Sequence, residues 1–244
     1  MKKIFLVLSN FLKIFVGRTN ETNRHAWVET KIRNIPKDSR ILDAGAGEQR
    51  YKELCSHLVY TSQDIAQYDG IGDGTGLQTG NWDYSKLDVI SNVTNIPFQD
   101  GAFDAILCTE VLEHIPEPTQ AITEFSRLLR QGGQLILTAP FCSITHFAPY
   151  HFSSGFNRYY YETIMPENHF EIIEISRNGN YFEYFAQELL RLPGVSLKYA
   201  DHGFNVLELF WITFGLIILN KLTKNNLGSE ELLCYGYHIH AFKI

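Results

Sequence analysis

Residues 40–47, which read Arg-Ile-Leu-Asp-Ala-Gly-Ala-Gly, constrain the fold of this chain more than any other segment. The apolar pair Ile41-Leu42 runs into an acid and then into two glycines, which is the pattern of a buried strand that breaks into a tight turn. Glycine permits a close approach between backbone and ligand, because it has no Cβ to collide with the ligand. We predict that a helix over 49–58 follows, so that its free N–H groups face the same ligand.

The residues around this turn distinguish two classes of ligand. Dinucleotide-binding folds use G-x-G-x-x-G, in which the third glycine lets the helix pack closely on the strand beneath a pyrophosphate. Here Arg50 stands where that third glycine is needed. The Asp43 carboxylate would also repel a pyrophosphate, whereas it would attract an ammonium or sulfonium group. The turn therefore favours a cationic ligand without a phosphate, and an ordinary strand-end turn is the alternative.

Strand and helix patterns alternate after this turn. Asp64 ends the next strand pattern, 21 residues after Asp43, which is a common distance for an acid that holds ribose hydroxyls. Such alternation predicts an α/β fold with a doubly wound, mostly parallel sheet that binds ligands at the carboxyl ends of its strands. The predicted strands cover 57–64, 86–91, 102–109 and 134–139, and a predicted helix covers 119–129.

Three further motifs follow the glycine turn in order. They are I-P-F-Q-D-G-A-F-D from residue 96, E-V-L-E-H-I-P from residue 110 and L-R-Q-G-G-Q-L-I-L-T-A-P from residue 129. Together with D-x-G-x-G they resemble the class I methyltransferases that depend on S-adenosylmethionine (SAM), and within them the type 11 family, over about residues 24–180. The resemblance implies a Rossmann-like sheet of seven strands with an antiparallel C-terminal edge over 232–243. It also implies SAM as cofactor and S-adenosylhomocysteine as product.

Residues at the strand ends would bind the cofactor in such a protein. Asp43 would lie near the amino group of the methionine part, and Asp64 would accept hydrogen bonds from the ribose hydroxyls. Asn92 stands where the family usually has an Asp that contacts the adenine amino group, and its carbonyl can still accept that hydrogen bond. Arg24 could clamp the methionine carboxylate, with an exposed arginine as the alternative. The other residues expected at the cofactor are Ala44, Gly45, Gly47, Tyr51, Ile65, Val93 and Thr109.

The methyl acceptor is expected to bind at the loop over 140–160, which is rich in His and Tyr. This loop resembles a pattern from a methyltransferase subgroup associated with surface-polysaccharide synthesis, but His151 replaces its usual Asp and Tyr160 its Thr. SAM arrives activated, so placing the acceptor is much of the catalytic task. The residues expected to bind the acceptor are Tyr150, His151, Arg158 and Tyr159.

An alcohol or amine acceptor also needs a base, and histidine works near neutral pH. His146 is the first candidate, with a place in the pocket wall as the alternative. Glu110 and His114 are the next candidates, and for His114 a structural role at the exit of the fourth strand is the alternative. The four cysteines form no C-x-x-C pair and no metal spacing, so no metal site is predicted.

Charge and hydropathy set the ends of the chain apart. Residues 1–40 carry a net charge of +6 and the remainder −12, so nucleic acid is not an expected partner. We predict a basic amphipathic segment over 1–23, then a single domain over 24–244 with an apolar helical insertion at about 204–222. The uncharged run 209–219 is too short to span a membrane. Segments 1–17 and 206–219 either dock on the inner face of a membrane or pack on their own domain.

Taken together, these patterns predict a cytoplasmic enzyme that transfers a methyl group from SAM to an oxygen or nitrogen atom. The acceptor would be a small molecule, a glycan or a lipid-linked compound. A SAM-binding or scaffold protein that lost turnover is the alternative. A nucleotide-dependent oxidoreductase is disfavoured by Arg50 and Asp43.

Overall fold

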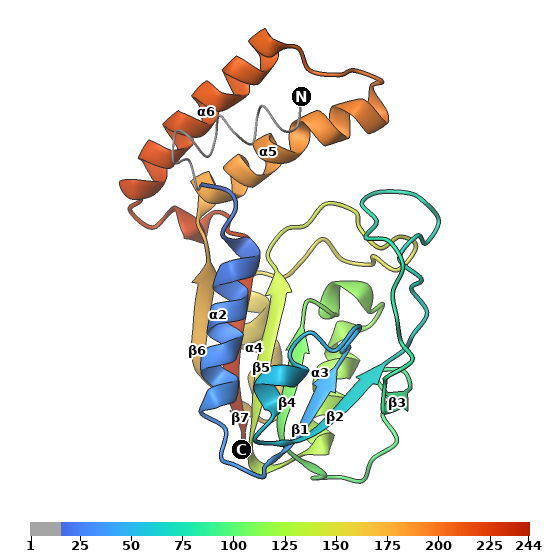
Figure 1. The fold of residues 1–244 in the computed structure, drawn as a ribbon. Coiled ribbons are helices and arrows are strands. Elements are labelled where there is room, and N and C mark those ends of the chain that lie inside the picture. The colour runs from blue at the N-terminus through green and yellow to red at the C-terminus, as the bar shows by residue number, and fades with distance from the viewer. Residues whose placement is uncertain (1–15) are drawn as a thin grey trace. The chain divides into compact units, whose positions relative to one another are not determined.

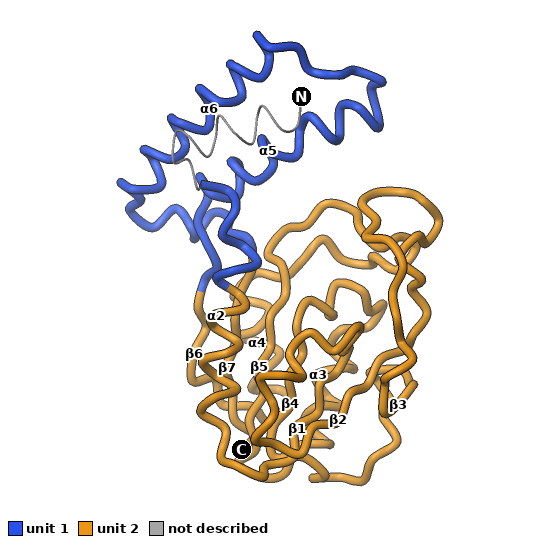
Figure 2. The backbone as a smooth tube through the Cα atoms, viewed as in Figure 1, with its two compact units in different colours: residues 1–23, 177–235 blue, residues 24–176, 236–244 orange. Residues whose placement is uncertain are grey.

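The computed structural model describes residues 16–244, and the chain divides into two compact units (Figures 1 and 2). Unit 2 comprises 24–176 and 236–244, and the described residues of unit 1 are 16–23 and 177–235. The apolar helical insertion predicted at about 204–222 lies within unit 1. Most of the basic segment predicted over 1–23 lies outside the described residues, so its amphipathic helix stays a prediction.

A seven-stranded sheet forms the centre of unit 2, in the order β3-β2-β1-β4-β5-β7-β6. Its strands are β1 (Arg40–Ala44), β2 (Val59–Asp64), β3 (Val89–Ile90), β4 (Phe103–Thr109), β5 (Leu129–Pro140), β6 (Phe170–Asn178) and β7 (Gly236–Lys243). The neighbouring pairs from β3 to β5 are parallel, whereas β7 runs antiparallel to β5. The predicted α/β fold with an antiparallel C-terminal edge is confirmed, although β3 is much shorter than the predicted strand.

Helices cover both faces of this sheet (Figure 1). They are α2 (Asn20–Arg33), α3 (Pro118–Leu128) and α4 (Arg158–Glu167). Val28 and Ile32 of α2 are fully buried against Ile41 of β1 and Leu107 of β4, which form the core of one layer. Pro118 begins α3, where its fixed φ suits the first helical position and its missing N–H is no loss.

The prediction of a helix over 49–58 is wrong. Only a short 3-10 helix, η1 (Lys52–Cys55), is present in that range. Gln49 has a φ of +58°, and its side-chain amide donates a 2.9 Å hydrogen bond to the Ser62 hydroxyl on β2. This left-handed backbone cannot continue a right-handed helix. The argument that a helix N-terminus faces the ligand therefore does not apply here.

Unit 1 is built from two helices, α5 (Tyr181–Tyr199) and α6 (Val206–Lys224). The Asn180 side chain accepts hydrogen bonds from the first N–H groups of α5, and Asn205 forms a capping box with Glu208 at the start of α6. Their shared core is small. It consists of Val16, Ala186, Ile212 and Leu216 with a few partly buried neighbours.

Among the described residues, α6 is the one helix long and apolar enough to cross a membrane. It is 19 residues long, so the uncharged run 209–219 is only its central part. Most of its apolar side chains are exposed, including Phe210, Trp211 and Phe214. Within the described part of the chain, only Ile212, Thr213 and Leu216 of α6 are buried, so most of its apolar surface is left uncovered there.

Candidate functional site

The glycine turn is tied to the end of the neighbouring strand. The Gly45 N–H donates to the carbonyl of Gln63 at 2.8 Å, and the Gly47 N–H donates to the Asp64 carboxylate at 2.9 Å. Both glycines have positive φ, +74° and +51°. A Cβ at Gly45 would lie 2.4 Å from Val111, and one at Gly47 would lie 2.6 Å from the Trp82 ring. Side chains of the protein itself therefore require glycine at both positions.

Asp43 lies beneath the turn and is only 2% exposed. Its carboxylate accepts a 2.6 Å hydrogen bond from the Tyr60 hydroxyl. Burial raises the pKa of Asp43 to about 7, although the hydrogen bond from Tyr60 opposes this shift. Ala44, Tyr51 and Thr109 are likewise outside the lining of the cavity described next.

A cavity of about 430 Å³ opens at the carboxyl ends of the strands. This volume is in the range of small-molecule binding sites. Eight of the predicted site residues line it: Gly45, Asp64, Ile65, Asn92, Val93, Glu110, His114 and Tyr150. The other residues that line the cavity were not predicted from the sequence. They are Gln63, Gln67, Tyr68, Trp82, Tyr84, Val111, Ile115, Pro116, Phe147 and Phe152.

The two polar residues predicted at the ribose and the adenine are held by short local hydrogen bonds. Asp64 accepts from the N–H groups of Gly47 and Ala66, each at 2.9 Å. The Asn92 carbonyl oxygen accepts from the backbone N–H and from the hydroxyl of Thr94, each at 3.0 Å. Both lone pairs of that oxygen are thus engaged, and the NH₂ group is the donor that Asn92 can turn to a ligand.

An aromatic wall closes one side of the cavity. Tyr68 stacks on Phe147 with ring centroids 4.5 Å apart, and Trp82 meets the same Phe147 ring edge-on at 5.4 Å. Tyr68 and Trp82 come from the loop between β2 and β3, and Phe147 comes from the loop after β5. Leu77 joins the two loops, because its N–H donates to Thr145 and its carbonyl accepts from the Phe147 N–H, each at 3.0 Å. The sequence does contain a sign of this wall, because Tyr68 and Trp82 stand in a stretch that is otherwise rich in Gly and Asp.

Glu110 follows β4 in a left-handed conformation with a φ of +55°. Arg24 of α2 pairs with one oxygen of its carboxylate at 2.8 Å, and the Thr138 hydroxyl donates to the other at 3.0 Å. The guanidinium predicted to clamp the methionine carboxylate is therefore already engaged by a carboxylate of the protein.

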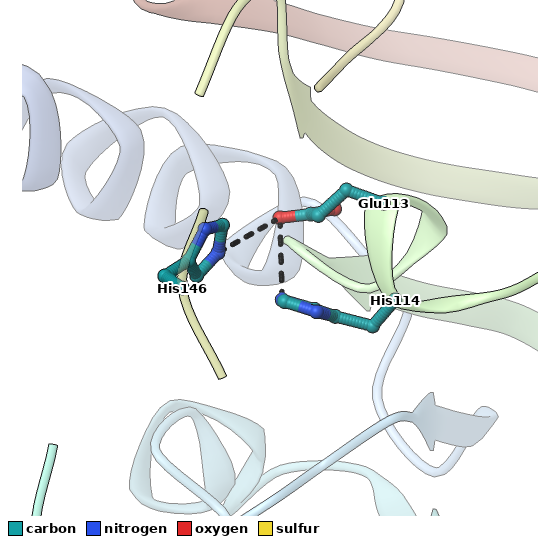
Figure 3. A group of neighbouring side chains, drawn as sticks. All are labelled: Glu113, His114 and His146. Carbon is teal, nitrogen blue, oxygen red and sulfur yellow. Dashed lines mark ion pairs between the residues drawn. The ribbon is translucent and has the colours of Figure 1, made fainter. Parts of the chain in front are cut away.

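A cluster of one glutamate and two histidines lies beside the cavity (Figure 3). Glu113 Oε1 is 3.7 Å from His114 Nε2 and 4.0 Å from His146 Nε2. Burial raises the pKa of the Glu113 carboxyl well above its usual range, and the nearby Glu110 adds to this. Burial and the neighbouring His146 lower the pKa of His114 to about 3. Glu113 was missed by sequence reasoning because it reads as an ordinary residue of the E-V-L-E-H motif.

The predicted base and the predicted acceptor residues divide into two groups. His114 and Tyr150 line the cavity, whereas His146 lies behind His114 with ring centroids 4.7 Å apart. His151 is near His146 and its Nε2 forms a 3.1 Å hydrogen bond with Ser143. Arg158 and Tyr159 do not line the cavity. They begin α4, and Tyr159 is 61% exposed to solvent.

Residues 42–137 match a family model described as a methyltransferase domain. The range runs from β1 into β5 and contains the glycine turn, Asp64, Asn92 and the Glu113-His114 pair. The predicted resemblance to methyltransferases that depend on SAM is confirmed over this range. SAM, the predicted cofactor, is the methyl donor of that family.

The chain is also similar to curated methyltransferases over part of its length. It is 34% identical over 116 residues to a ubiquinone biosynthesis O-methyltransferase of Dechloromonas aromatica, covering 46% of this chain and 48% of that protein. It is 52% identical over 104 residues to a protein of the same name from Xanthomonas oryzae pv. oryzae, covering 41% and 42%. It is 25% identical over 109 residues to norajmaline N-methyltransferase of Rauvolfia serpentina, covering 41% and 36%. The chain thus spans less than half of the length of these relatives.

Solved structures with a similar backbone cover nearly the whole chain. A protein of Galdieria sulphuraria, described as a sarcosine dimethylglycine methyltransferase, has a TM-score of 0.54 at 14% identity, covering 93% of this chain and 85% of its own. The YcgJ protein of Bacillus subtilis has a TM-score of 0.53 at 14% identity, covering 91% and 98%. The (4+2)-cyclase SpnF has a TM-score of 0.51 at 17% identity, covering 88% and 79%. At such low identity the likeness shows the fold alone.

Proposed function

We propose that this protein transfers a methyl group from SAM to an oxygen or nitrogen atom of an acceptor, because residues 42–137 match a family model described as a methyltransferase domain. The acceptor is a small molecule, a glycan or a lipid-linked compound. One observation carries the proposal: Asp64 ends β2, Asn92 and Glu110 come after β3 and β4, and all three line the same cavity. Ligands of doubly wound sheets bind at this edge.

The cofactor occupies the part of the cavity that these strand ends form. Asp64 accepts hydrogen bonds from the ribose hydroxyls, while Ile65 packs on the adenine and Val93 offers its backbone N–H to it. The buried Asp43 acts from behind the wall, by favouring the positive charge of the methionine part. Glu110, whose side chain is 29% exposed and paired with Arg24, stands where β4 ends, beside the place proposed for the sulfonium.

The acceptor occupies the side lined by His114, Phe147, Tyr150 and Phe152. Aromatic rings on this side give flat apolar contacts for a ring or chain of the acceptor. The cluster of Glu113, His114 and His146 removes the acceptor proton during transfer. A hydroxyl acceptor is favoured, because the O-methyltransferases of Dechloromonas and Xanthomonas are the more similar relatives.

Calorimetry with SAM and with NAD tests the cofactor, and detection of methylated product with candidate acceptors tests the reaction. The expected result is binding of SAM and not of NAD, with S-adenosylhomocysteine formed in the presence of an acceptor. Binding of SAM without turnover on any hydroxyl or amine acceptor would favour the alternative of a SAM-binding scaffold. SpnF is a (4+2)-cyclase with a similar fold, so the fold alone does not establish methyl transfer and the product must be detected.

The substitution Asp64→Asn is expected to weaken SAM binding by roughly 10- to 100-fold, because a hydrogen bond to a charged group contributes about 1.5–3 kcal/mol. Calorimetric titration with SAM measures this change. The matched control is Asp73→Asn. Asp73 also accepts from the N–H two residues on, at 2.8 Å, but it does not line the cavity. Equal SAM affinity of the Asp64→Asn variant and the wild type would contradict the ribose role.

We further propose that the protein is cytoplasmic and attaches to the inner face of the membrane through α6. The exposed aromatic residues Phe210, Trp211 and Phe214 follow one another at helical spacing, and Lys221 and Lys224 lie in the last turn. An apolar face that ends in basic residues suits a bilayer with anionic headgroups. Residues 1–17 were also predicted to contact the membrane, but most of this segment lies outside the described residues.

Flotation with vesicles that contain phosphatidylglycerol measures this attachment. Trp211→Ser is expected to reduce vesicle binding by roughly 10-fold, because burying a large apolar side chain contributes about 1.5–3 kcal/mol. Ile173→Ser is the control, since Ile173 is exposed on β6 and belongs to no apolar helix face. A wild-type protein that stays out of the vesicle fraction would refute membrane attachment.

A further inference from the structure

Three atoms that can bind a cation converge at Glu113, His114 and His146 (Figure 3). One oxygen of the Glu113 carboxylate and one nitrogen of each imidazole lie within 4.8 Å of one another. They come from two segments of unit 2, the short 3-10 helix η2 (Leu112–His114) after β4 and the loop after β5. Their meeting is therefore a product of the fold and not of a local sequence motif.

The hydrogen bonds of the two histidines determine which nitrogen is available. His114 Nδ1 lies 2.6 Å from the carbonyl oxygen of Tyr150, and His146 Nδ1 lies 2.9 Å from that of Ile144. A carbonyl can only accept, so each Nδ1 carries a hydrogen. In the neutral rings each Nε2 then holds a lone pair, and both Nε2 atoms are directed at Glu113. Metal-binding histidines show this arrangement, with the second nitrogen donating to a carbonyl.

Glu113 adds a buried carboxylate to the two imidazoles. It is 1% exposed, and its Oε2 has no hydrogen-bond partner among the described residues. An ionised Glu113 would face two imidazole lone pairs, which is unfavourable in a buried place. A protonated Glu113 could donate to only one of the two rings. A cation, in contrast, satisfies all three groups at once.

We propose that Glu113, His114 and His146 bind one divalent first-row transition-metal cation of the class of Zn²⁺. Two imidazoles and one carboxylate are the ligands of many catalytic zinc sites, which leave further coordination positions open. Ligand atoms on a tetrahedral zinc lie roughly 3.3 Å apart, given zinc bonds of about 2.0–2.2 Å. The separations of 3.7 and 4.0 Å from Glu113, and the spread of up to 4.8 Å across the three atoms, would therefore shorten through rotation of the side chains.

The place of this site suggests what the cation does, and this step rests on the proposed function. His114 lines the cavity, so the cation lies at its edge, next to the side assigned to the acceptor. With the cation bound, these atoms of Glu113, His114 and His146 serve as its ligands and no longer take up the acceptor proton. The open positions of the cation would instead bind an acceptor oxygen and lower the pKa of that hydroxyl, whose proton would pass to water. No metal site was predicted from the sequence, because the cysteines form no metal-binding motif. The proposed site consists of one carboxylate and two imidazoles and needs no cysteine. Its third ligand lies 32 residues beyond the Glu113-His114 pair.

Calorimetric titration of the full chain with ZnCl₂, after removal of metal with a chelator and without SAM, tests the proposal. We expect one Zn²⁺ per chain, and an affinity that falls by about 100-fold or more in Glu113→Gln and in His146→Ala. His169→Asn is the control, because His169 is exposed and outside the cluster. The absorption spectrum of Co²⁺ bound to the same preparations reports whether nitrogen and oxygen ligands surround the ion.

Melting in the presence of chelator shows whether each variant is folded. If Glu113→Gln does not fold, His146→Ala decides, since His146 is partly exposed. Absence of stoichiometric Zn²⁺ binding by the wild type, or unchanged affinity in the folded variants, would overturn the metal site. SAM titration of the same samples keeps the two proposals apart. Zinc binding without SAM binding would refute only the proposed function, and the reverse would refute only the metal site.

Discussion

Replacing Gly45 with alanine is expected to lower the free energy of unfolding by about 3 kcal/mol and to abolish SAM binding. Gly45 has a φ of +74°, a conformation that costs a residue with a Cβ roughly 1–2 kcal/mol. The new Cβ would also lie 2.4 Å from Val111 Cγ2, and overpacking of this kind costs about 1–3 kcal/mol. Denaturant unfolding followed by circular dichroism measures the loss of stability, and calorimetry measures SAM binding.

Gly74 provides a matched control for the backbone conformation alone. Its φ is +76°, but a Cβ at this position would meet nothing within 4 Å. Gly74→Ala should therefore cost only the conformational part, roughly 1–2 kcal/mol. The difference between the two variants measures the close packing of Val111 on the turn. Equal losses of unfolding free energy in both variants would show that contact with Val111 adds no cost to a Cβ at Gly45.

The second large effect is expected on turnover. We expect His146→Ala to reduce the rate of methyl transfer by about 10²- to 10⁴-fold, which is the usual contribution of a positioned acid–base group. SAM affinity should change little, because His146 does not line the cavity. His146 acts through its contacts with Glu113 and His114, so the loss should fall on kcat and not on KM.

Single-turnover measurement with a methylated product as readout checks this expectation once an acceptor is found. His169→Asn, outside the cluster, is expected to retain the wild-type rate. A His146→Ala variant that binds SAM and turns over at the full rate would remove His146 from the path of the proton. A variant with raised KM and unchanged kcat would instead place His146 in the binding of the acceptor.

Many features of the cavity follow from local sequence patterns. Asp64 and Asn92 could be placed because Asp64 ends one strand pattern and Asn92 follows another, and the carboxyl ends of parallel strands meet at one edge of the sheet. Ile65 and Val93, which come next in the chain, line the same cavity for the same reason. Strand patterns are read over a few residues, so they need no knowledge of distant contacts.

Other predictions failed or stayed open because distant residues decide them. The helix predicted over 49–58 is absent, since the Gln49 side chain is held by Ser62 on β2. Trp82 reaches Gly47 only because the loop between β2 and β3 folds back over the glycine turn. Arg24 is near the cavity as predicted, but its partner Glu110 lies 86 residues away in the chain.

By itself the sequence determined the sheet and the glycine turn after β1, because strand periodicity and glycine backbone freedom are local properties. The class of methyl donor followed from the resemblance of its ordered motifs to a known family. Only the tertiary structure decided what surrounds the donor. The aromatic wall depends on two loops joined through Leu77. The cluster of Glu113, His114 and His146 exists because the loop after β5 is hydrogen-bonded to the backbone of Glu113. Contacts between residues far apart in the chain leave no periodic pattern in the sequence, and they decide the acceptor side of this site.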